Sequence, residues 1–281
     1  MPSPTTPVSV IIPTHNRGGF LAQAIDSVLS QSCGNFELIV VDDGSTDETQ
    51  ALLASYGKAL IVLRQENQGP AAARNVGIRA ARHPLLAFLD SDDRFARQKL
   101  ALQVAAMEAQ PELLISHTQE TWFRNGHHFN QKKRHTKEGG DIFARCLALC
   151  VVGMSTVMAR RELFARIGLF DEALACCEDY DLLLRASVAH PFLLVDVPLT
   201  DKHGGRPDQL SVQFKTGMDR FRLRALENLL AEVPLTPEQS RLAREELVRK
   251  AVIYGNGCLK HGRSEEGRRS LALAGRYAPS L

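Results

Sequence analysis

Long apolar runs are absent from this sequence of 281 residues. The longest mainly apolar stretch spans residues 147–159 and is interrupted by Gly153, Ser155 and Thr156. It is shorter than the ~20 residues that a membrane-spanning helix needs, so we predict no such helix. The first seven residues carry no basic side chain, unlike a secretory signal. These features predict a cytoplasmic protein.

An excess of one charge is also absent. The sequence has 34 Lys and Arg against 32 Asp and Glu, a formal charge of +2, which argues against a nucleic-acid partner. Residues 217–281 are more basic, with 12 Lys and Arg against 8 Asp and Glu. This segment is therefore a candidate for peripheral contact with an anionic membrane at its inner face, although basic side chains on an amphipathic helix more often form a solvated face.

Cysteine is sparse, and the six cysteines include no C-x-x-C pair. A chain of this length can bury a core without disulfides, so we predict reduced thiols. With 44% hydrophobic and 23% charged residues, the composition is that of a globular protein. We find no internal repeat or low-complexity segment.

The first hundred residues contain four short apolar runs, each followed by a helical pattern: Val8–Ile12, Phe36–Val41, Leu60–Leu63 and Leu85–Leu89. Such alternation predicts an α/β fold, with a parallel sheet and helices on both faces. Ser45 and Glu48 have the spacing of a capping box, which predicts a helix from there to Tyr56. Pro70 suits the first turn of a helix over 71–81.

The remaining sequence predicts a less regular arrangement. Helices are expected over 94–110, 141–152, 161–167 and 178–190, and strands over 155–159 and 192–197. Residues 118–140 indicate a strand or two with a mobile loop. Beyond Gly217 the pattern is almost wholly helical.

Polar clusters follow the predicted strands at 15–17, 42–43 and 90–93, where ligands bind in parallel α/β sheets. Asp90 and Asp92 are two residues apart, so their carboxylates lie on the same side of an extended segment. Such a pair can hold Mg²⁺ or Mn²⁺ through oxygen atoms. Taken alone, the pattern is more often a solvated turn or a helix cap.

Five segments change this interpretation because they occur together and in order. They are VSVIIPTHN (8–16), ELIVVDDGST (37–46), NQGPAAARNVG (67–77), AFLDSDD (87–93) and EDYDLLLR (178–185). Together they resemble the inverting family 2 glycosyltransferases with the GT-A fold, a Rossmann-like, mainly parallel sheet flanked by helices. The resemblance covers roughly 7–205.

The resemblance implies a division of the chain. Residues 1–216 would form the GT-A domain, with a donor half over 7–104 and an acceptor half over 105–216. Residues 217–281 would form a helical C-terminal extension outside the resemblance, and its helices are candidates for a homodimer contact.

For the nucleotide-sugar donor, the resemblance implies the following roles. Pro13, His15 and Asn16 would flank the base, and Asp43 would accept a hydrogen bond from its imide N–H, which uracil and thymine offer. Arg74 would approach the nucleotide or its pyrophosphate. Asp43 could instead serve only to end a strand before a helix cap.

The resemblance also implies a divalent cation, Mn²⁺ or Mg²⁺, that bridges the two phosphates. Asp92 would hold it, with Asp90 near the ribose and available as a second ligand. His203 is a third candidate ligand, from a segment that closes over the donor phosphates. A hydrogen-bonded loop histidine is the alternative for His203.

Asp179 would be the general base that takes the proton of the acceptor hydroxyl, with Glu178 beside it. A carboxylate suits this step because a hydroxyl is a poor nucleophile at neutral pH. One displacement then inverts the anomeric configuration without a covalent intermediate. Glu178 could instead be an acid that stabilises the start of a helix.

The Q-x-x-R-W motif of processive family members is missing, and Trp122 is the only tryptophan. The sequence therefore predicts transfer of a single sugar from a UDP- or dTDP-linked donor to a cell-surface glycan or a lipid-linked precursor. Two alternatives stay open: a sugar nucleotidyltransferase, for which 13–19 would be a poor phosphate loop, and a catalytically silent carbohydrate-binding or scaffold module of the same fold. The carboxylates at 43, 90, 92 and 179 argue against the silent module.

Overall fold

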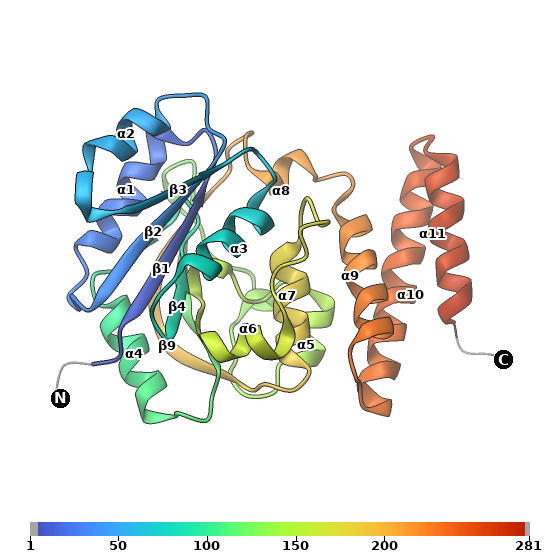
Figure 1. The fold of residues 1–281 in the computed structure, drawn as a ribbon. Coiled ribbons are helices and arrows are strands. Elements are labelled where there is room, and N and C mark those ends of the chain that lie inside the picture. Colours follow the sequence, from blue (N-terminus) through green and yellow to red (C-terminus); the bar gives the residue numbers. More distant parts are fainter. Residues whose placement is uncertain (1–4, 279–281) are drawn as a thin grey trace.

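A computed structural model describes residues 5–278 as a mixed α/β structure (Figure 1). Its strands form one sheet in the order β3-β2-β1-β4-β8-β6-β9-β5, with β7 beside β6. The strands are β1 (Val8–Thr14), β2 (Phe36–Asp43), β3 (Ile61–Gln65), β4 (Leu85–Phe88), β5 (Arg94–Phe95), β6 (Ile115–Arg124), β7 (His127–His128), β8 (Met158–Arg160) and β9 (Phe192–Gly204).

The sheet has two halves. Strands β3, β2, β1 and β4 are parallel, and β8 pairs with β4 in the antiparallel direction. Beyond β8, strands β6 and β9 pair in parallel along most of their length. The predicted α/β fold class is confirmed, and the parallel half places the ends of β1, β2 and β4 at one edge.

The helices are α1 (Gly18–Leu29), α2 (Thr49–Ser55), α3 (Pro70–Ala80), α4 (Lys99–Ala109), α5 (Phe143–Ala148), α6 (Arg161–Ile167), α7 (Glu178–Ser187), α8 (Leu210–Gln213), α9 (Met218–Glu232), α10 (Pro237–Lys260) and α11 (Ser264–Tyr277). Pro70 lies in the first turn of α3, as predicted. No helix formed by residues 5–278 is long and apolar enough to cross a membrane.

Two predicted helix starts were wrong. Helix α2 begins at Thr49 without a capping box, because the Ser45 hydroxyl instead accepts a hydrogen bond from the backbone N–H of Asn16 at 2.9 Å. The helix predicted over 94–110 begins only at Lys99, because β5 pairs with β9. Both differences come from partners distant in sequence, which override a local pattern.

Both faces of the parallel half are apolar, which is why its strands appear as continuous hydrophobic runs. On β1, Val10 and Ile12 belong to the buried cluster that contains α1 and α4, whereas Ile11 belongs to the cluster that contains α3 and α7. Helix α3 approaches β1 closely at Gly77, where an added Cβ would lie 2.4 Å from a methyl group of Ile11. A larger residue there would push α3 away from the sheet.

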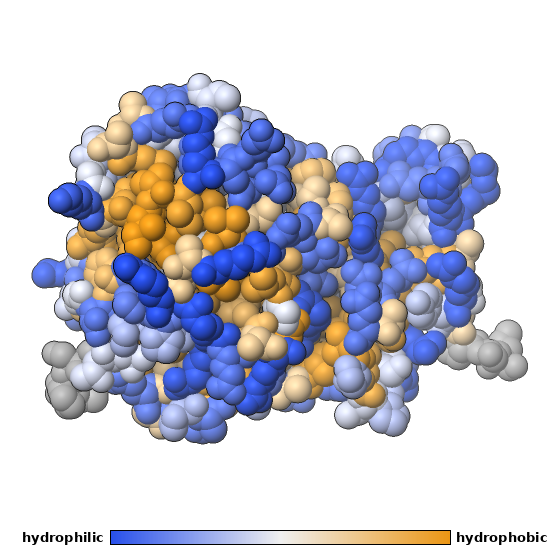
Figure 2. Space-filling view, viewed as in Figure 1, coloured by the Kyte–Doolittle hydropathy of each residue, from blue (hydrophilic) through white to orange (hydrophobic). Residues whose placement is uncertain are grey.

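The C-terminal helices continue this core. Leu223, Leu226 and Leu229 of α9 are buried in the same cluster as Leu183 of α7. Helices α10 and α11 pack as a pair at the far end of the molecule. Figure 2 shows that hydrophilic residues largely cover this end, whereas apolar residues gather over β1 to β3. The division at residue 216 stays a prediction, although α9 packs directly on the preceding residues.

Candidate active site

A pocket of about 710 Å³ opens beyond the carboxyl ends of β1, β2 and β4. The structure brings all the sequence-predicted site residues to its lining: Pro13, His15, Asn16, Asp43, Arg74, Asp90, Asp92, Glu178, Asp179 and His203. They come from segments separated by up to 190 residues, since Pro13 and His203 line the same space. The role of each residue stays a prediction, and the geometry below bears on it.

Asp43 ends β2 and organises the loop that leads into α3. Its carboxylate accepts hydrogen bonds from the backbone N–H groups of Gln68 and Gly69, at 2.9 and 2.8 Å, and from the Gln65 amide at 2.6 Å. A carboxylate has about four acceptor positions, so one is left for a ligand. Asp43 is therefore a rigidly held acceptor at the pocket wall.

The loop after β1 is tied to the loop after β2. His15 Nδ1 lies 2.8 Å from the backbone carbonyl of Asp43, and Asn16 accepts a hydrogen bond from the backbone N–H of Thr46 at 2.8 Å. Asn16 has a φ of 52°, a left-handed conformation that asparagine tolerates better than most residues. These contacts fix the positions of His15 and Asn16 beside Asp43.

Arg74, on α3, joins the two sides of the pocket. Its guanidinium donates to Asp90 at 2.7 Å and to Glu178 at 2.5 Å. Burial raises the pKa of Glu178 above its usual value, although the charge of Arg74 opposes this effect. Arg74 thus holds a carboxylate from the donor half and one from the acceptor half at the same time.

Asp179 lies in the first turn of α7 and is partly exposed to the pocket. Its Oδ2 accepts a hydrogen bond from the Cys150 thiol at 3.4 Å. Burial, together with the charge of Asp179, raises the pKa of Cys150 well above its usual value, so the thiol stays protonated and keeps donating. Cys177, the N-cap residue of α7, adopts a left-handed φ of 65°, a conformation that a residue other than glycine adopts at a cost in free energy.

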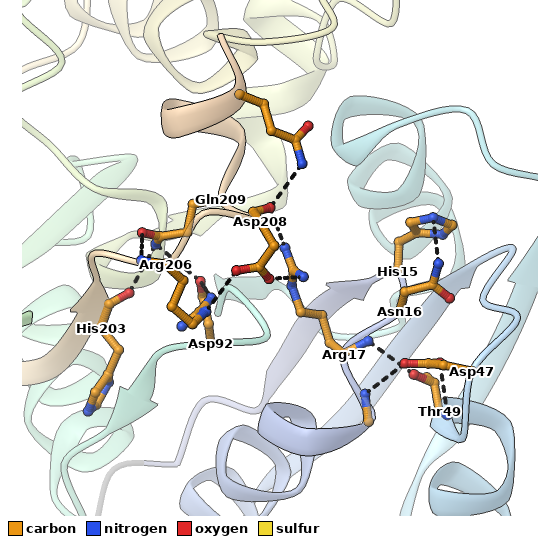
Figure 3. A network of polar contacts seen from close by, with 12 residues as sticks. His15, Asn16, Arg17, Asp47, Thr49, Asp92, His203, Arg206, Asp208 and Gln209 are labelled. Atoms are coloured by element: carbon orange, nitrogen blue, oxygen red, sulfur yellow. Dashed lines mark hydrogen bonds and ion pairs between the residues drawn. The ribbon is translucent and has the colours of Figure 1, made fainter. Parts of the chain in front are cut away.

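Asp92 is held from the segment after β9 (Figure 3). Its Oδ2 accepts from the Arg206 guanidinium at 2.5 Å and from the Gln209 amide at 3.4 Å. The same segment is tied to the loop after β1 by an ion pair between Arg17 and Asp208. Residues 206–209 therefore cover the Asp92 end of the pocket.

The His203 ring does not reach this carboxylate. It stacks on the Phe123 ring at 5.1 Å and points away from Asp92 in Figure 3. Burial lowers the pKa of His203, which favours the neutral ring. Among residues 5–278, no group of three or more His, Cys, Asp or Glu side chains is arranged to hold a metal ion. The predicted three-ligand set of Asp90, Asp92 and His203 is therefore not assembled in this structure.

The two aspartates fit a divalent cation better without the histidine. Within the described chain, Arg74 engages only Oδ1 of Asp90, and Arg206 and Gln209 engage only Oδ2 of Asp92, so each carboxylate keeps one oxygen without a donor. Mg²⁺ and Mn²⁺ bind oxygen and commonly use one or two carboxylates, completed by water and phosphate oxygens. The donor set suits that arrangement.

Asp93 has a structural role next to this pair. Its carboxylate accepts from the Ser155 hydroxyl at 2.7 Å and from the backbone N–H of His203 at 2.9 Å. Burial raises the pKa of Asp93 well above its usual value, and the charges of Asp92 and Asp90 add to the effect. Asp93 therefore anchors the end of β9 at the pocket wall.

Several lining residues were missed by the sequence interpretation. Lys202 lies one residue before His203 on β9, and Met218 and Arg222 come from α9, beyond the end of the resemblance. A position near the end of a strand at the ligand-binding edge was the signal available for Lys202. Nothing in the sequence pattern pointed to Met218 and Arg222.

The family model described as glycosyl transferase family 2 matches residues 9–168. The chain belongs to this family. An uncharacterized glycosyltransferase of Rickettsia conorii is 38% identical over 182 residues, which cover 62% of this chain and 29% of that protein. The chain thus spans less than a third of the length of this relative. The predicted family resemblance is confirmed.

Solved structures extend the similarity in fold. TarS of S. aureus, solved in complex with UDP-GlcNAc, has a TM-score of 0.65 at 18% identity, covering 96% of this chain and 91% of that chain. The mannosyltransferase PcManGT of Pyrobaculum calidifontis, solved with GDP-Man and Mn²⁺, also has a TM-score of 0.65 at 18% identity, covering 100% and 79%. At these identities the likeness concerns the fold, and it includes the C-terminal helices of this family member.

Proposed function

We propose that this chain is an inverting, non-processive glycosyltransferase that moves one sugar from a nucleotide-diphosphate sugar to an acceptor hydroxyl. One observation carries the proposal: the ten residues singled out from the family motifs line a single pocket. Family membership supports glycosyl transfer over the sugar nucleotidyltransferase alternative. The fold neighbours bind UDP-GlcNAc and GDP-Man, which supports a nucleotide-sugar donor here.

The donor would lie along the ends of β1, β2 and β4. The fixed carboxylate of Asp43 has one acceptor position left, which suits the imide N–H of uracil or thymine. We therefore expect a UDP- or dTDP-linked sugar. Asp90, held by Arg74, would lie near the ribose.

Asp92 and Asp90 would hold Mn²⁺ or Mg²⁺ through the oxygens that lack a donor. When bound, such a cation neutralises the charge that develops on the departing nucleoside diphosphate. Arg206 would have to give up its contact with Asp92, or share it, as the donor enters.

Asp179 would take the proton from the acceptor hydroxyl. The thiol of Cys150 contacts one of its oxygens, and the backbone N–H of Tyr180 contacts the other at 2.7 Å, so the carboxylate is fixed in orientation. Glu178, already paired with Arg74, would keep the neighbouring Asp179 in position. A cell-surface glycan or a lipid-linked precursor is the acceptor that we expect.

Calorimetric titration tests this function. The chain should bind UDP or dTDP more tightly with Mn²⁺ than with EDTA, and Asp92→Asn should abolish most of that difference. Asp43→Ala should weaken binding under both conditions. If no nucleoside diphosphate binds with or without Mn²⁺, the proposal is wrong. A cytoplasmic location, membrane contact and a homodimer through the C-terminal helices stay predictions.

A further inference from the structure

The pocket is strongly acidic for a site that would bind a diphosphate. Its lining includes seven carboxylates: Asp43, Asp90, Asp92, Asp93, Glu178, Asp179 and Asp208. It includes four Lys and Arg side chains: Arg17, Arg74, Lys202 and Arg222. Without a bound cation this balance would repel a diphosphate, so positive charge from the protein would have to add to that of the proposed cation at the phosphates.

Most of that positive charge is already used. Arg17 pairs with Asp208, Arg74 pairs with both Asp90 and Glu178, and Arg222 pairs with Asp219. Each of these guanidiniums has a carboxylate at contact distance that offsets its charge, although the Nε atoms of Arg74 and Arg222 have no hydrogen-bond partner among the described residues.

Lys202 differs from the other three. Within residues 5–278 its ammonium makes no ion pair, and no hydrogen bond to a described group engages it. The side chain is only partly exposed, and it lines the same space as Arg74, Asp90 and Asp179. A lysine ammonium carries three donors, so a partly buried one whose donors are not used by the described residues can donate to a phosphate oxygen.

The nearest carboxylates surround this ammonium without contacting it. Gly153 lies beside it: an added Cβ would be 3.4 Å from Lys202 Nζ and 3.0 Å from Glu120 Oε2. Glu120 is occupied on its other oxygen by Lys137 at 3.3 Å and by the Trp122 indole at 2.8 Å. Carboxylates of Asp93 and Asp90 complete the charged surroundings of Lys202.

We propose that the Lys202 ammonium binds a phosphate oxygen of the nucleotide-sugar donor. The assignment rests on the proposed function and adds a residue to it. A point charge at this position would bind the diphosphate before reaction and stabilise it further as the bond to the anomeric carbon breaks and the electron pair moves to the phosphate oxygen. Lys202 would thus supply the positive charge that the paired arginines do not.

The test compares UDP with uridine, because only UDP carries phosphates, and repeats the comparison with GDP and guanosine. Lys202→Met should weaken diphosphate affinity by about 10- to 100-fold in EDTA, the usual worth of a hydrogen bond to a charged group, while nucleoside affinity stays constant. Lys202→Arg, which keeps the charge, should recover part of the loss. Lys260→Met is the control, since Lys260 is exposed at the end of α10 and does not line the pocket.

A second measurement uses the unaltered chain and does not depend on the folding of a variant. Acetic anhydride labelling followed by mass spectrometry should find Lys202 protected about fivefold or more by UDP or GDP but not by the nucleoside, with the exposed Lys260, which does not line the pocket, as the internal reference. Two results would overturn the Lys202 assignment alone. One is equal labelling of Lys202 in the presence of the diphosphate and of the nucleoside. The other is a folded Lys202→Met variant whose ratio of diphosphate affinity to nucleoside affinity equals that of the parent chain. If the parent chain binds neither UDP nor GDP, even with Mn²⁺, the proposed function fails first.

Discussion

The guanidinium of Arg206 lies 2.5 Å from Oδ2 of Asp92, the carboxylate that the family motif assigns to a divalent cation. Arg206 also stacks over the Phe20 ring at 4.2 Å, so the contact is held from two sides. A guanidinium and a metal ion carry like charge, and both require the same carboxylate. Cation binding at Asp92 is therefore coupled to the position of residues 206–209.

Arg206→Gln should increase the affinity for Mn²⁺ in the absence of nucleotide. The guanidinium competes through a partly buried ion pair, so its loss should tighten binding by about 3- to 10-fold. Titration of Mn²⁺ followed by electron paramagnetic resonance measures this directly. Arg166→Gln, which removes a surface ion pair with Glu162, is the control. Equal Mn²⁺ affinity in Arg206→Gln and the parent chain would contradict the coupling.

Asp179→Asn should separate chemistry from donor binding. The amide keeps the shape of the side chain but cannot take a proton, so turnover should fall by about 10²–10⁴-fold while nucleotide affinity stays constant. Steady-state rates at saturating donor would measure the change. Asp181→Asn is a matched control: Asp181 is buried and paired with Arg185, so this variant should lose stability and keep most of its turnover when folded. Parent-like turnover in Asp179→Asn would move the base to another residue.

Shortening the chain at two points should distinguish the pocket wall from the distal helices. A chain that ends at Thr216 loses Met218 and Arg222 from the pocket, together with the buried leucines of α9. It should lose nucleotide binding or fail to fold. A chain that ends at Val233 keeps α9 and should still bind nucleotide. Its melting temperature should be lower, because the contacts that α10 makes with α9 and α5 are lost. Nucleotide binding by the chain that ends at Thr216 would refute this expectation.

Lys99 should make stability depend on pH. Burial, with the charge of Lys137, lowers the pKa of Lys99 to about 7, and Glu120 only partly opposes this. An unfolded lysine has a pKa of about 10.4, so between these values the unfolded chain binds more protons and the free energy of unfolding rises with pH. From pH 7 to 9, the parent chain should gain up to about 2 kcal/mol relative to Lys99→Met. Urea denaturation at several pH values checks this, and a difference that does not vary with pH would contradict it.

The donor side was predictable from sequence because its signals are local. Buried parallel strands appear as apolar runs, and the residues that end them, such as Asp43 and Asp90, follow directly. The other side was less predictable. Strand β9 continues through the polar residues Asp201–Gly204 because its backbone pairs with β6, a contact that side-chain periodicity does not report.

Side-chain orientation was the least predictable property of the site. His203 was expected at the metal, yet its ring stacks on Phe123, which lies 80 residues earlier and has no motif around it. The pairing of Arg206 with Asp92 and the contribution of α9 depend equally on tertiary packing. Sequence motifs therefore predicted which residues gather at the pocket better than how those residues contact one another.

The position of Arg74 between two carboxylates has a consequence for how the two substrates bind. A single guanidinium binds Asp90, which belongs to the nucleotide side, and Glu178, which neighbours the expected base. Any ligand that changes the hold of Arg74 on one carboxylate also changes its hold on the other, and such linkage is reciprocal. The acceptor affinity measured with a nucleotide present should therefore differ from that of the empty protein, and the nucleotide affinity should change by the same factor when the acceptor is bound.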